Sequence, residues 1–299
     1  MNKLRLALDW TPNINHIGFF VAREKGFYKE TGIKLDIIDP SADDYAVTPA
    51  KKVELGQADF ALCPTESVIS YRTKPKPFDL IGIATIFQED LSAIAVKSNS
   101  GISSPKDLDG KSYASYQARY EDGIVKQMIK NDGGEGKIAI DYPKKLGIWD
   151  TLLAGSFDST WIFLNWEGVE AESIGAELNY FKMEDYGVPY SYSPLLVASE
   201  SRINLDLELY RDFMAATTRG HEFARENLAE SVELFKSFIP RKDEKINLAK
   251  ALQISTSAFG KNWGKMDEKR VNTFLSWIYK NDLETSELKV SDIVTNILF

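Results

Sequence analysis

The sequence predicts an α/β protein with two lobes, each built on a mostly parallel β-sheet flanked by helices, with a cleft between the lobes. Three observations lead to this prediction. Strand-length apolar segments alternate with helical segments along residues 4–87, which is typical of a parallel sheet covered on both faces. A second series of the same kind occupies residues 91–164, and a strand near residues 188–199 returns to the first unit. Neither crossing contains a linker-like stretch, so we expect a hinged molecule with its ligand site between the lobes.

The first unit begins with a strand at residues 4–8, where Leu4, Leu6 and Leu8 alternate with polar or small residues. A turn follows, and then a helix that Gly26 ends. Later in this unit, we predict strands at residues 33–39, 58–62 and 80–87 and helices at residues 45–55 and 65–72.

The second unit repeats this organisation. Its strands are predicted at residues 91–97, 112–115, 137–141 and 159–164, and its helices at residues 121–130 and 149–154. The segments 56–59 (GQAD) and 155–158 (GSFD) both close a helix and lead into an apolar strand, which indicates two similarly built lobes. Residues 206–238, 244–258 and 267–280 are helical by period and length. We therefore assign residues 1–90 and 190–299 to the first lobe and residues 91–189 to the second.

Composition restricts the function. The net charge of -8 and the absence of a Lys/Arg stripe exclude nucleic acid as a partner. Cys63 is the only cysteine and lies in an apolar strand, so we expect a buried core residue. With it, His16 and His221 cannot form a zinc site of imidazole and thiolate ligands, and we expect His221 to be a partly exposed helix residue. The sequence predicts no metal and no cofactor.

The amino-terminal region bears on where the protein resides. No segment approaches the ~20 apolar residues of a spanning helix, and the first strand begins almost at Met1 without a signal peptide. We therefore expect a cytoplasmic protein. The alternative is a periplasmic or lipid-anchored protein with its signal peptide trimmed away, and only then is a membrane importer an expected partner.

Candidate ligand-binding residues gather at the joints between strands and helices. Trp10, Asn13 and His16 follow the first strand, at the sheet edge where ligands bind in open α/β folds and beside a helix N-terminus. Trp10 at this edge favours a stacking wall over a core position, and we place His16 in the cleft.

The equivalent joint of the second unit contains Tyr116, Arg119 and Tyr120. The planar guanidinium of Arg119 can hold a phosphate or carboxylate bidentately. It can equally form a surface pair with Glu121 or Asp122, and the sequence leaves both interpretations open.

Three segments resemble a known family. DWTPNINHIGFFVAREKGFYKETGI (residues 9–33) has a Trp, a Pro two residues later, a His opening the helix, then KG(F/Y)(F/Y)KE and a Gly before the second strand. FLNWEGVEAE (residues 163–172) and DYGVPYSYSPLLVASE (residues 185–200) extend the match over about two-thirds of the chain. The chain thereby resembles the thiamine-pyrimidine-precursor family, which contains solute-binding proteins of bacterial importers and pyrimidine synthases. The resemblance implies a type II periplasmic-binding-protein fold.

This resemblance completes the expected site. Glu167 can accept hydrogen bonds from the exocyclic amine of an aminopyrimidine, although a first-turn Glu is also favoured by the helix dipole alone. Glu66 follows a first-lobe strand, and Tyr190 lies at the return crossing. We expect the ligand-binding residues to be Trp10, Asn13, His16, Glu66, Tyr116, Arg119, Tyr120, Trp166, Glu167 and Tyr190.

Three functions fit these residues. The first is a binding protein for a thiamine pyrimidine precursor or related heteroaromatic vitamer. The second is a synthase that makes the pyrimidine from pyridoxal phosphate and one of its own histidines. The third is a carrier or sensor of a sulfonate, a flavin or a phosphorylated vitamer. The synthases carry a CCCFC-type run and a substrate histidine, whereas VPYSYSPLLVAS has no cysteine and TESVISYRT has no histidine. We therefore predict a solute-binding protein for a small heteroaromatic ligand, and not an enzyme.

Overall fold

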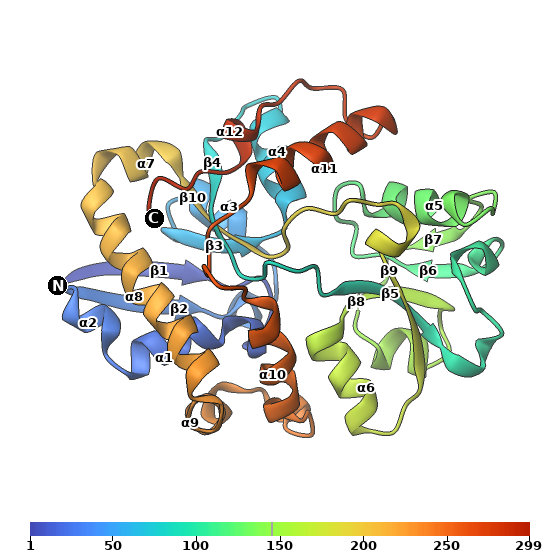
Figure 1. Ribbon diagram of the computed structural model, residues 1–299, viewed down its shortest axis with the longest axis horizontal. Coiled ribbons are helices and arrows are strands. Elements are labelled where there is room, and N and C mark those ends of the chain that lie inside the picture. Colours follow the sequence, from blue (N-terminus) through green and yellow to red (C-terminus); the bar gives the residue numbers. More distant parts are fainter. Residues whose placement is uncertain (145) are drawn as a thin grey trace.

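The computed structural model of the protein describes residues 1–144 and 146–299. Two lobes lie side by side, each with a β-sheet flanked by helices (Figure 1). The first lobe combines the amino-terminal and carboxyl-terminal parts of the chain, drawn in blue and in orange to red, and the second contains the middle part, in green and yellow. The predicted fold class, two sheets with flanking helices in two lobes, is confirmed.

The two sheets share one topology. In spatial order, the first sheet consists of β2 (Ile33–Ile38), β1 (Asn2–Ala7), β3 (Phe60–Cys63), β10 (Leu195–Ser199) and β4 (Leu80–Thr85). The second sheet has the matching order β7 (Ala139–Asp141), β6 (Ser112–Ala114), β8 (Ser159–Phe163), β5 (Ser92–Lys97) and β9 (Leu178–Lys182). Strands β1 to β4 and β10 therefore form one sheet and β5 to β9 the other, while the division at residues 90 and 190 stays a prediction.

Each sheet has one reversed strand. β10 is antiparallel to both β3 and β4, and β5 is antiparallel to both β8 and β9. The pairings of β1 with β2 and β3, and of β6 with β7 and β8, are parallel. β5 and β10 are the first strands after the two crossings, so they start at the cleft and run away from it. The other strands run the opposite way, and their carboxyl ends lie at the cleft.

The segments 56–59 and 155–158 make equivalent contacts in the two lobes. Gly56 and Gly155 both have a positive φ, near 70°, which ends the preceding segment. Asp59 Oδ2 then accepts a hydrogen bond from the backbone N–H of Arg5 on β1, at 2.8 Å. Asp158 Oδ2 accepts the corresponding bond from Ser112 on β6, also at 2.8 Å. Each aspartate thus ties a strand to its parallel neighbour, which confirms the predicted likeness of the lobes.

Helices α1 (Ile17–Glu24) and α8 (Leu207–Glu226) pack closely in the first lobe. A Cβ on Gly220 would lie 2.1 Å from the backbone oxygen of Gly18, so only glycine allows this approach. It encloses His221, which is fully buried and stacks on Trp263 with ring centroids 3.7 Å apart. Burial lowers the pKa of His221 to about 3. The prediction of a partly exposed His221 is wrong, because α1 covers this face of α8.

The remaining helices differ from the predictions mainly at their ends. The helix expected at residues 45–55 begins later, because Tyr45 has a φ of 59° and Pro49 starts the helix after the Thr48 N-cap. The segment 206–238 is divided at Asn227. These helices are α2 (Phe27–Glu30), α3 (Pro49–Glu54), α4 (Thr65–Thr73), α5 (Glu121–Asn131), α6 (Val169–Ser173), α7 (Glu200–Leu205), α9 (Leu228–Phe235), α10 (Leu248–Ala258), α11 (Glu268–Lys280) and α12 (Val290–Ile293), of which α2, α7 and α12 were not predicted, nor was strand β9.

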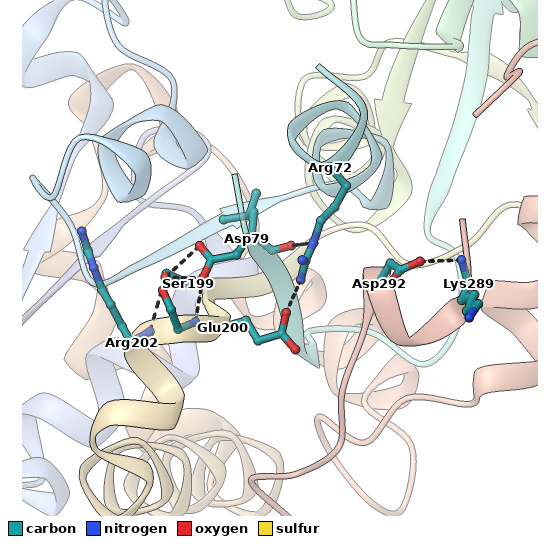
Figure 2. A network of polar contacts seen from close by, with 9 residues as sticks. Arg72, Asp79, Ser199, Glu200, Arg202, Lys289 and Asp292 are labelled. Atoms are coloured by element: carbon teal, nitrogen blue, oxygen red, sulfur yellow. Dashed lines mark hydrogen bonds and ion pairs between the residues drawn. The ribbon is translucent and has the colours of Figure 1, made fainter. Parts of the chain in front are cut away.

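A polar network fastens the end of the first sheet that lies away from the cleft (Figure 2). Arg72 on α4 donates to the backbone oxygen of Leu80 and pairs with Glu200, both at 2.8 Å. Asp79 accepts from the hydroxyl of Ser199 at 3.0 Å and from the backbone N–H of Ser201 at 2.7 Å. These contacts join α4, β4 and α7, so the first lobe is held together independently of the cleft.

Candidate functional site

A cavity of about 230 Å³ lies between the lobes, at the carboxyl ends of the strands. Both lobes and the return crossing from β9 to β10 contribute to its wall. The lining consists of Asp9, Trp10, Asn13, Asn15, Pro64, Glu66, Tyr116, Ala118, Glu121, Trp161, Phe163, Trp166, Glu167, Tyr190 and Ser193. Most of the predicted site residues meet here, namely Trp10, Asn13, Glu66, Tyr116, Trp166, Glu167 and Tyr190. That they bind a ligand stays a prediction.

His16 is not part of the lining, contrary to its predicted place in the cleft. Its side chain is fully buried beneath the joint between β1 and α1. Nδ1 accepts a hydrogen bond from the backbone N–H of Asn13 at 3.2 Å, which leaves Nε2 to donate to Asp9 Oδ1 at 2.8 Å. The imidazole therefore fixes the turn and holds the Asp9 carboxylate, which itself lines the cavity.

Arg119 and Tyr120 are also absent from the lining, and neither interpretation of Arg119 describes its contacts. Arg119 donates to Thr73 Oγ1 at 2.6 Å and forms an ion pair with Glu284. The Tyr120 hydroxyl donates to the same carboxylate. Glu284 follows α11 in the first lobe and is buried, so these contacts join the two lobes beside the cavity.

The cavity wall is largely aromatic. Trp10 is half-buried and lies edge-on to Tyr116 of the other lobe, with ring centroids 6.4 Å apart. Trp161 meets Tyr190 edge to face at 5.3 Å. Trp161 and Phe163 were not predicted, although their alternate positions in β8 place both side chains on one face of that strand. Such a wall can hold a flat ring by offset or edge-to-face contacts.

Glu66 and Glu167 occupy equivalent positions, in the first helical turns that follow β3 and β8. Glu66 is buried; its Oε1 accepts from the Tyr190 hydroxyl at 2.7 Å, and its Oε2 has no partner among the described residues. Glu167 belongs to the π-helical turn Leu164–Gly168 and accepts from the backbone N–H of Phe163 at 2.9 Å. Burial raises the pKa of each carboxyl to about 7.

Glu121, another lining carboxylate, is engaged by its own loop. It accepts from the Tyr113 hydroxyl at 2.6 Å and from the backbone N–H groups of Tyr116 and Ala118, both at 3.0 Å. Burial raises its pKa, while these three hydrogen bonds act in the opposite direction. This residue is the second-lobe counterpart of His16, because it supplies the acceptors that the turn requires.

Asn165 joins the lobes on another side of the cavity. Its side chain is fully buried, and Nδ2 donates to Asn15 Oδ1 and to Ser255 Oγ, both at 2.7 Å. Asn165 follows β8, whereas Asn15 and Ser255 belong to the first lobe. These bonds require the two lobes to be close together, as in a closed cleft.

Two further features bear on the kind of site. Within residues 1–144 and 146–299, no three His, Cys, Asp or Glu side chains are grouped so that they could hold a metal ion. In the same ranges, no helix has the length and apolar character needed to cross a membrane. Cys63 is buried in β3 as predicted, and burial raises the pKa of its thiol.

Sequence relatives include both binding proteins and synthases. The formylaminopyrimidine-binding protein of Halalkalibacterium halodurans is 26% identical over 237 residues, which cover 78% of this chain and 70% of that protein. The 4-amino-5-hydroxymethyl-2-methylpyrimidine phosphate synthase of Legionella pneumophila is 27% identical over 236 residues, covering 78% of this chain and 72% of that protein.

Solved structures show the fold. A Candida albicans protein described as having the generic periplasmic binding protein fold matches with a TM-score of 0.70 and 13% identity, over 99% of this chain and 97% of that one. The periplasmic aliphatic sulphonate-binding protein SsuA of Escherichia coli matches with a TM-score of 0.68 and 13% identity, over 98% and 91%. The expected periplasmic-binding-protein fold is thereby confirmed, whereas the expected cytoplasmic location finds no support among these proteins.

The family follows from a match to a family profile. The profile of the NMT1/THI5-like family matches residues 13–231, a range that contains both crossings, Glu66, Glu167 and the whole of α8. It also contains all three segments on which the resemblance rested, except the first four residues of the first segment. This chain belongs to the NMT1/THI5-like family.

Proposed function

We propose that the protein is a solute-binding protein that closes its two lobes on a thiamine pyrimidine precursor or a related heteroaromatic vitamer. The observation that carries this proposal is the interlobe cavity, whose aromatic wall comes from both lobes. A relative that is 26% identical is a formylaminopyrimidine-binding protein, which supports a pyrimidine as the ligand. The volume of about 230 Å³ lies below the range of about 300–1,000 Å³ usual for drug-sized ligands, and this favours a single substituted ring.

In this proposal the ligand ring stacks on Trp10, Trp166 or both, because flat rings gain from offset aromatic contact. Polar groups around the wall fix its orientation. Asn13 can donate to or accept from ring nitrogens, and Glu167 can accept from an exocyclic amine. Bonds between the lobes, such as those of Asn165, then favour the closed arrangement around the ring.

The synthase alternative has less support in this chain. A synthase of the expected kind consumes one of its own histidines, and the sequence contains only His16 and His221. Both side chains are fully buried, and neither is among the described lining residues. The cysteine run of those enzymes is missing as well, so the binding function accounts for more of what this chain contains.

We also propose a location outside the cytoplasm and a membrane importer as the partner. The support is the fold shared with periplasmic binding proteins. Fractionation of the source cells, followed by detection with an antiserum, tests this location. Recovery only in the cytoplasmic fraction would refute it.

Native mass spectrometry of protein purified without added ligand, followed by calorimetry with formylaminopyrimidine and its aminopyrimidine relatives, tests the binding function. We expect a heteroaromatic compound that is either retained through purification or bound in the titration.

Trp10→Ala should weaken the binding of this ligand by about 1–3 kcal/mol, the range for a ring stacked on an aromatic side chain, without loss of the fold. The matched control is Trp149→Ala, since Trp149 is exposed and outside the lining. Equal affinities for Trp10→Ala and the unaltered protein would show that the ligand does not stack on Trp10.

A further inference from the structure

Every charged residue in the described lining of the cavity is acidic. Asp9, Glu66, Glu121 and Glu167 line it, and no arginine, lysine or histidine is among the described lining residues. Arg119, the one cation expected to hold a phosphate, is bound to Glu284 instead. Lys242 lies 5.9 Å from the centre of the Trp10 ring, but its side chain is exposed at the rim.

These carboxylates are not equally engaged. Asp9 is bound by His16, and Glu121 accepts three hydrogen bonds from its own lobe. Glu66 differs, because it is 2% exposed and its Oε2 has no hydrogen-bond partner in the described parts of the chain. A buried hydrogen-bond acceptor without a donor destabilises the protein, so we expect a donor group of the ligand to bind this oxygen.

Glu167 faces the same cavity from the opposite lobe. In the part of the chain that the structure describes, its carboxylate accepts one hydrogen bond, from the backbone N–H of Phe163. Burial raises the pKa of Glu66 and of Glu167 to about 7, because each carboxylate loses hydration and the described lining contains no cation to compensate. An ammonium or amine group of the ligand would stabilise the charged form of both.

We propose that this cavity selects heteroaromatic ligands bearing an ammonium or amine group, held by Glu66 and Glu167, and excludes ligands bearing a phosphate or sulfonate. The inference rests on the proposed binding function and narrows it to one charge class. Of the ligands that the sequence left open, it disfavours sulfonates and phosphorylated vitamers. A phosphate would lie among carboxylates with no counter-charge among the described lining residues, and such like-charge contacts oppose binding strongly.

Three pyrimidines that share the 4-amino-2-methyl ring and differ only at C5 provide the test, in calorimetry at pH 7. Their C5 substituents are aminomethyl, hydroxymethyl and the phosphate ester of hydroxymethyl. We expect the aminomethyl compound to bind at least as tightly as the hydroxymethyl compound. The phosphate ester should bind about 100-fold more weakly than the hydroxymethyl compound. A phosphate ester that binds within tenfold of the hydroxymethyl compound, or more tightly, would overturn the inference and leave the binding function intact.

The double variant Glu66→Gln, Glu167→Gln tests whether these two carboxyls cause the predicted order of affinities. Glutamine keeps the shape and removes the charge, so the discrimination against phosphate should fall to less than about tenfold. Glu226→Gln, at an exposed position of α8, is the control and should keep the full discrimination. Unchanged discrimination in the double variant would refute the assigned role of these carboxyls.

A failure of all three pyrimidines to bind would count against the proposed function, and a second matched set then tests the charge class. Benzylammonium, benzyl alcohol and benzyl phosphate can be titrated at millimolar concentration while the indole N–H signals are followed by NMR. Preference for the cation supports the inference. Preference for the phosphate, or equal shifts with all three compounds, would overturn it.

Discussion

The joints that follow β1 and β6 occupy equivalent places in the two lobes, yet they present different groups to the cleft. After β1, Trp10, Asn13 and Asn15 all reach the cavity wall, and the imidazole of His16 lies beneath them. After β6, Tyr116 reaches the wall, whereas the next charged side chain, Arg119, extends across the lobe boundary to Glu284.

Each turn needs acceptors for its buried backbone N–H groups, and the lobes meet this need differently. The first joint uses the imidazole of His16 and the second the carboxylate of Glu121. The second joint also contains two residues with positive φ, Gln117 at 60° and Tyr120 at 69°. Such conformations redirect the side chains, and here Tyr120 meets Glu284 outside the cavity. The shared topology therefore determines where each joint lies, whereas the local hydrogen bonds determine which side chains face the cavity.

His16→Ala should have the largest effect, because it breaks the first joint from within. The substitution leaves the backbone N–H of Asn13 and the Asp9 carboxylate without a partner and creates a cavity. We expect the free energy of unfolding to fall by about 3 kcal/mol, measured by urea denaturation. A loss below about 1 kcal/mol would mean that the first joint does not depend on the imidazole.

Asn165→Ala tests whether the first joint is also held from the other lobe. The change removes the donor to Asn15 and Ser255 while leaving both acceptors in place. We expect ligand affinity to fall by about 2 kcal/mol in calorimetry, because closing the lobes no longer forms these bonds. Asn204→Ala, at an exposed position of α7, is the control and should leave affinity unchanged. Equal affinity for both variants would show that the hydrogen bonds of Asn165 do not stabilise the closed arrangement.

Glu284→Gln tests the contact made by the second joint. Burial raises the pKa of Glu284. Its hydrogen bonds from Tyr120, Ser286 and Thr285 and the charge of Arg119 lower the pKa by more than burial raises it. The resulting pKa lies below the usual value of 4.5. The charged pair therefore stabilises the closed form above about pH 4.5, and this contribution is lost as the pH falls below that value.

We expect the variant to favour an open molecule by about 1 kcal/mol at neutral pH, seen as a larger radius of gyration in small-angle X-ray scattering. The unaltered protein should expand as the pH falls below about 4.5, and the variant should lack this step. A variant with the same acid expansion as the unaltered protein would show that another group controls it. Glu287→Gln provides a control at a neighbouring exposed carboxylate.

Lys242→Ala should have the smallest effect. The exposed ammonium lies 5.9 Å from the Trp10 ring, a distance at which a cation–π contact contributes about 0.5 kcal/mol or less. Calorimetry should therefore show less than a threefold change in affinity for the aminopyrimidines. A larger loss would show that a cation beside the first joint contributes to binding, contrary to a site whose charged groups are carboxylates.

The organisation of the molecule and much of its cavity could be predicted from the amino-acid sequence. Hydrophobic periodicity located most strands and helices, because the local period depends on which face of each element is buried. The repeated G-x-x-D segments indicated two similar lobes. Trp10, Tyr116, Glu66 and Glu167 could be predicted for the cleft because each follows a strand, and strand ends gather at one edge of a sheet.

Contacts that form only in the folded molecule set the direction of β5 and β10, the burial of His16 and His221, and the partner of Arg119. The last of these shows the reason most clearly. Glu284 lies 165 residues from Arg119 in the sequence and meets it only when the lobes are together. The neighbouring acids Glu121 and Asp122 looked equally suitable in the sequence, but Glu121 is already engaged by its own loop and Asp122 by the hydroxyls of Ser115 and Tyr142. Competition among partners distant in sequence depends on the packed arrangement, and a local pattern contains no record of it.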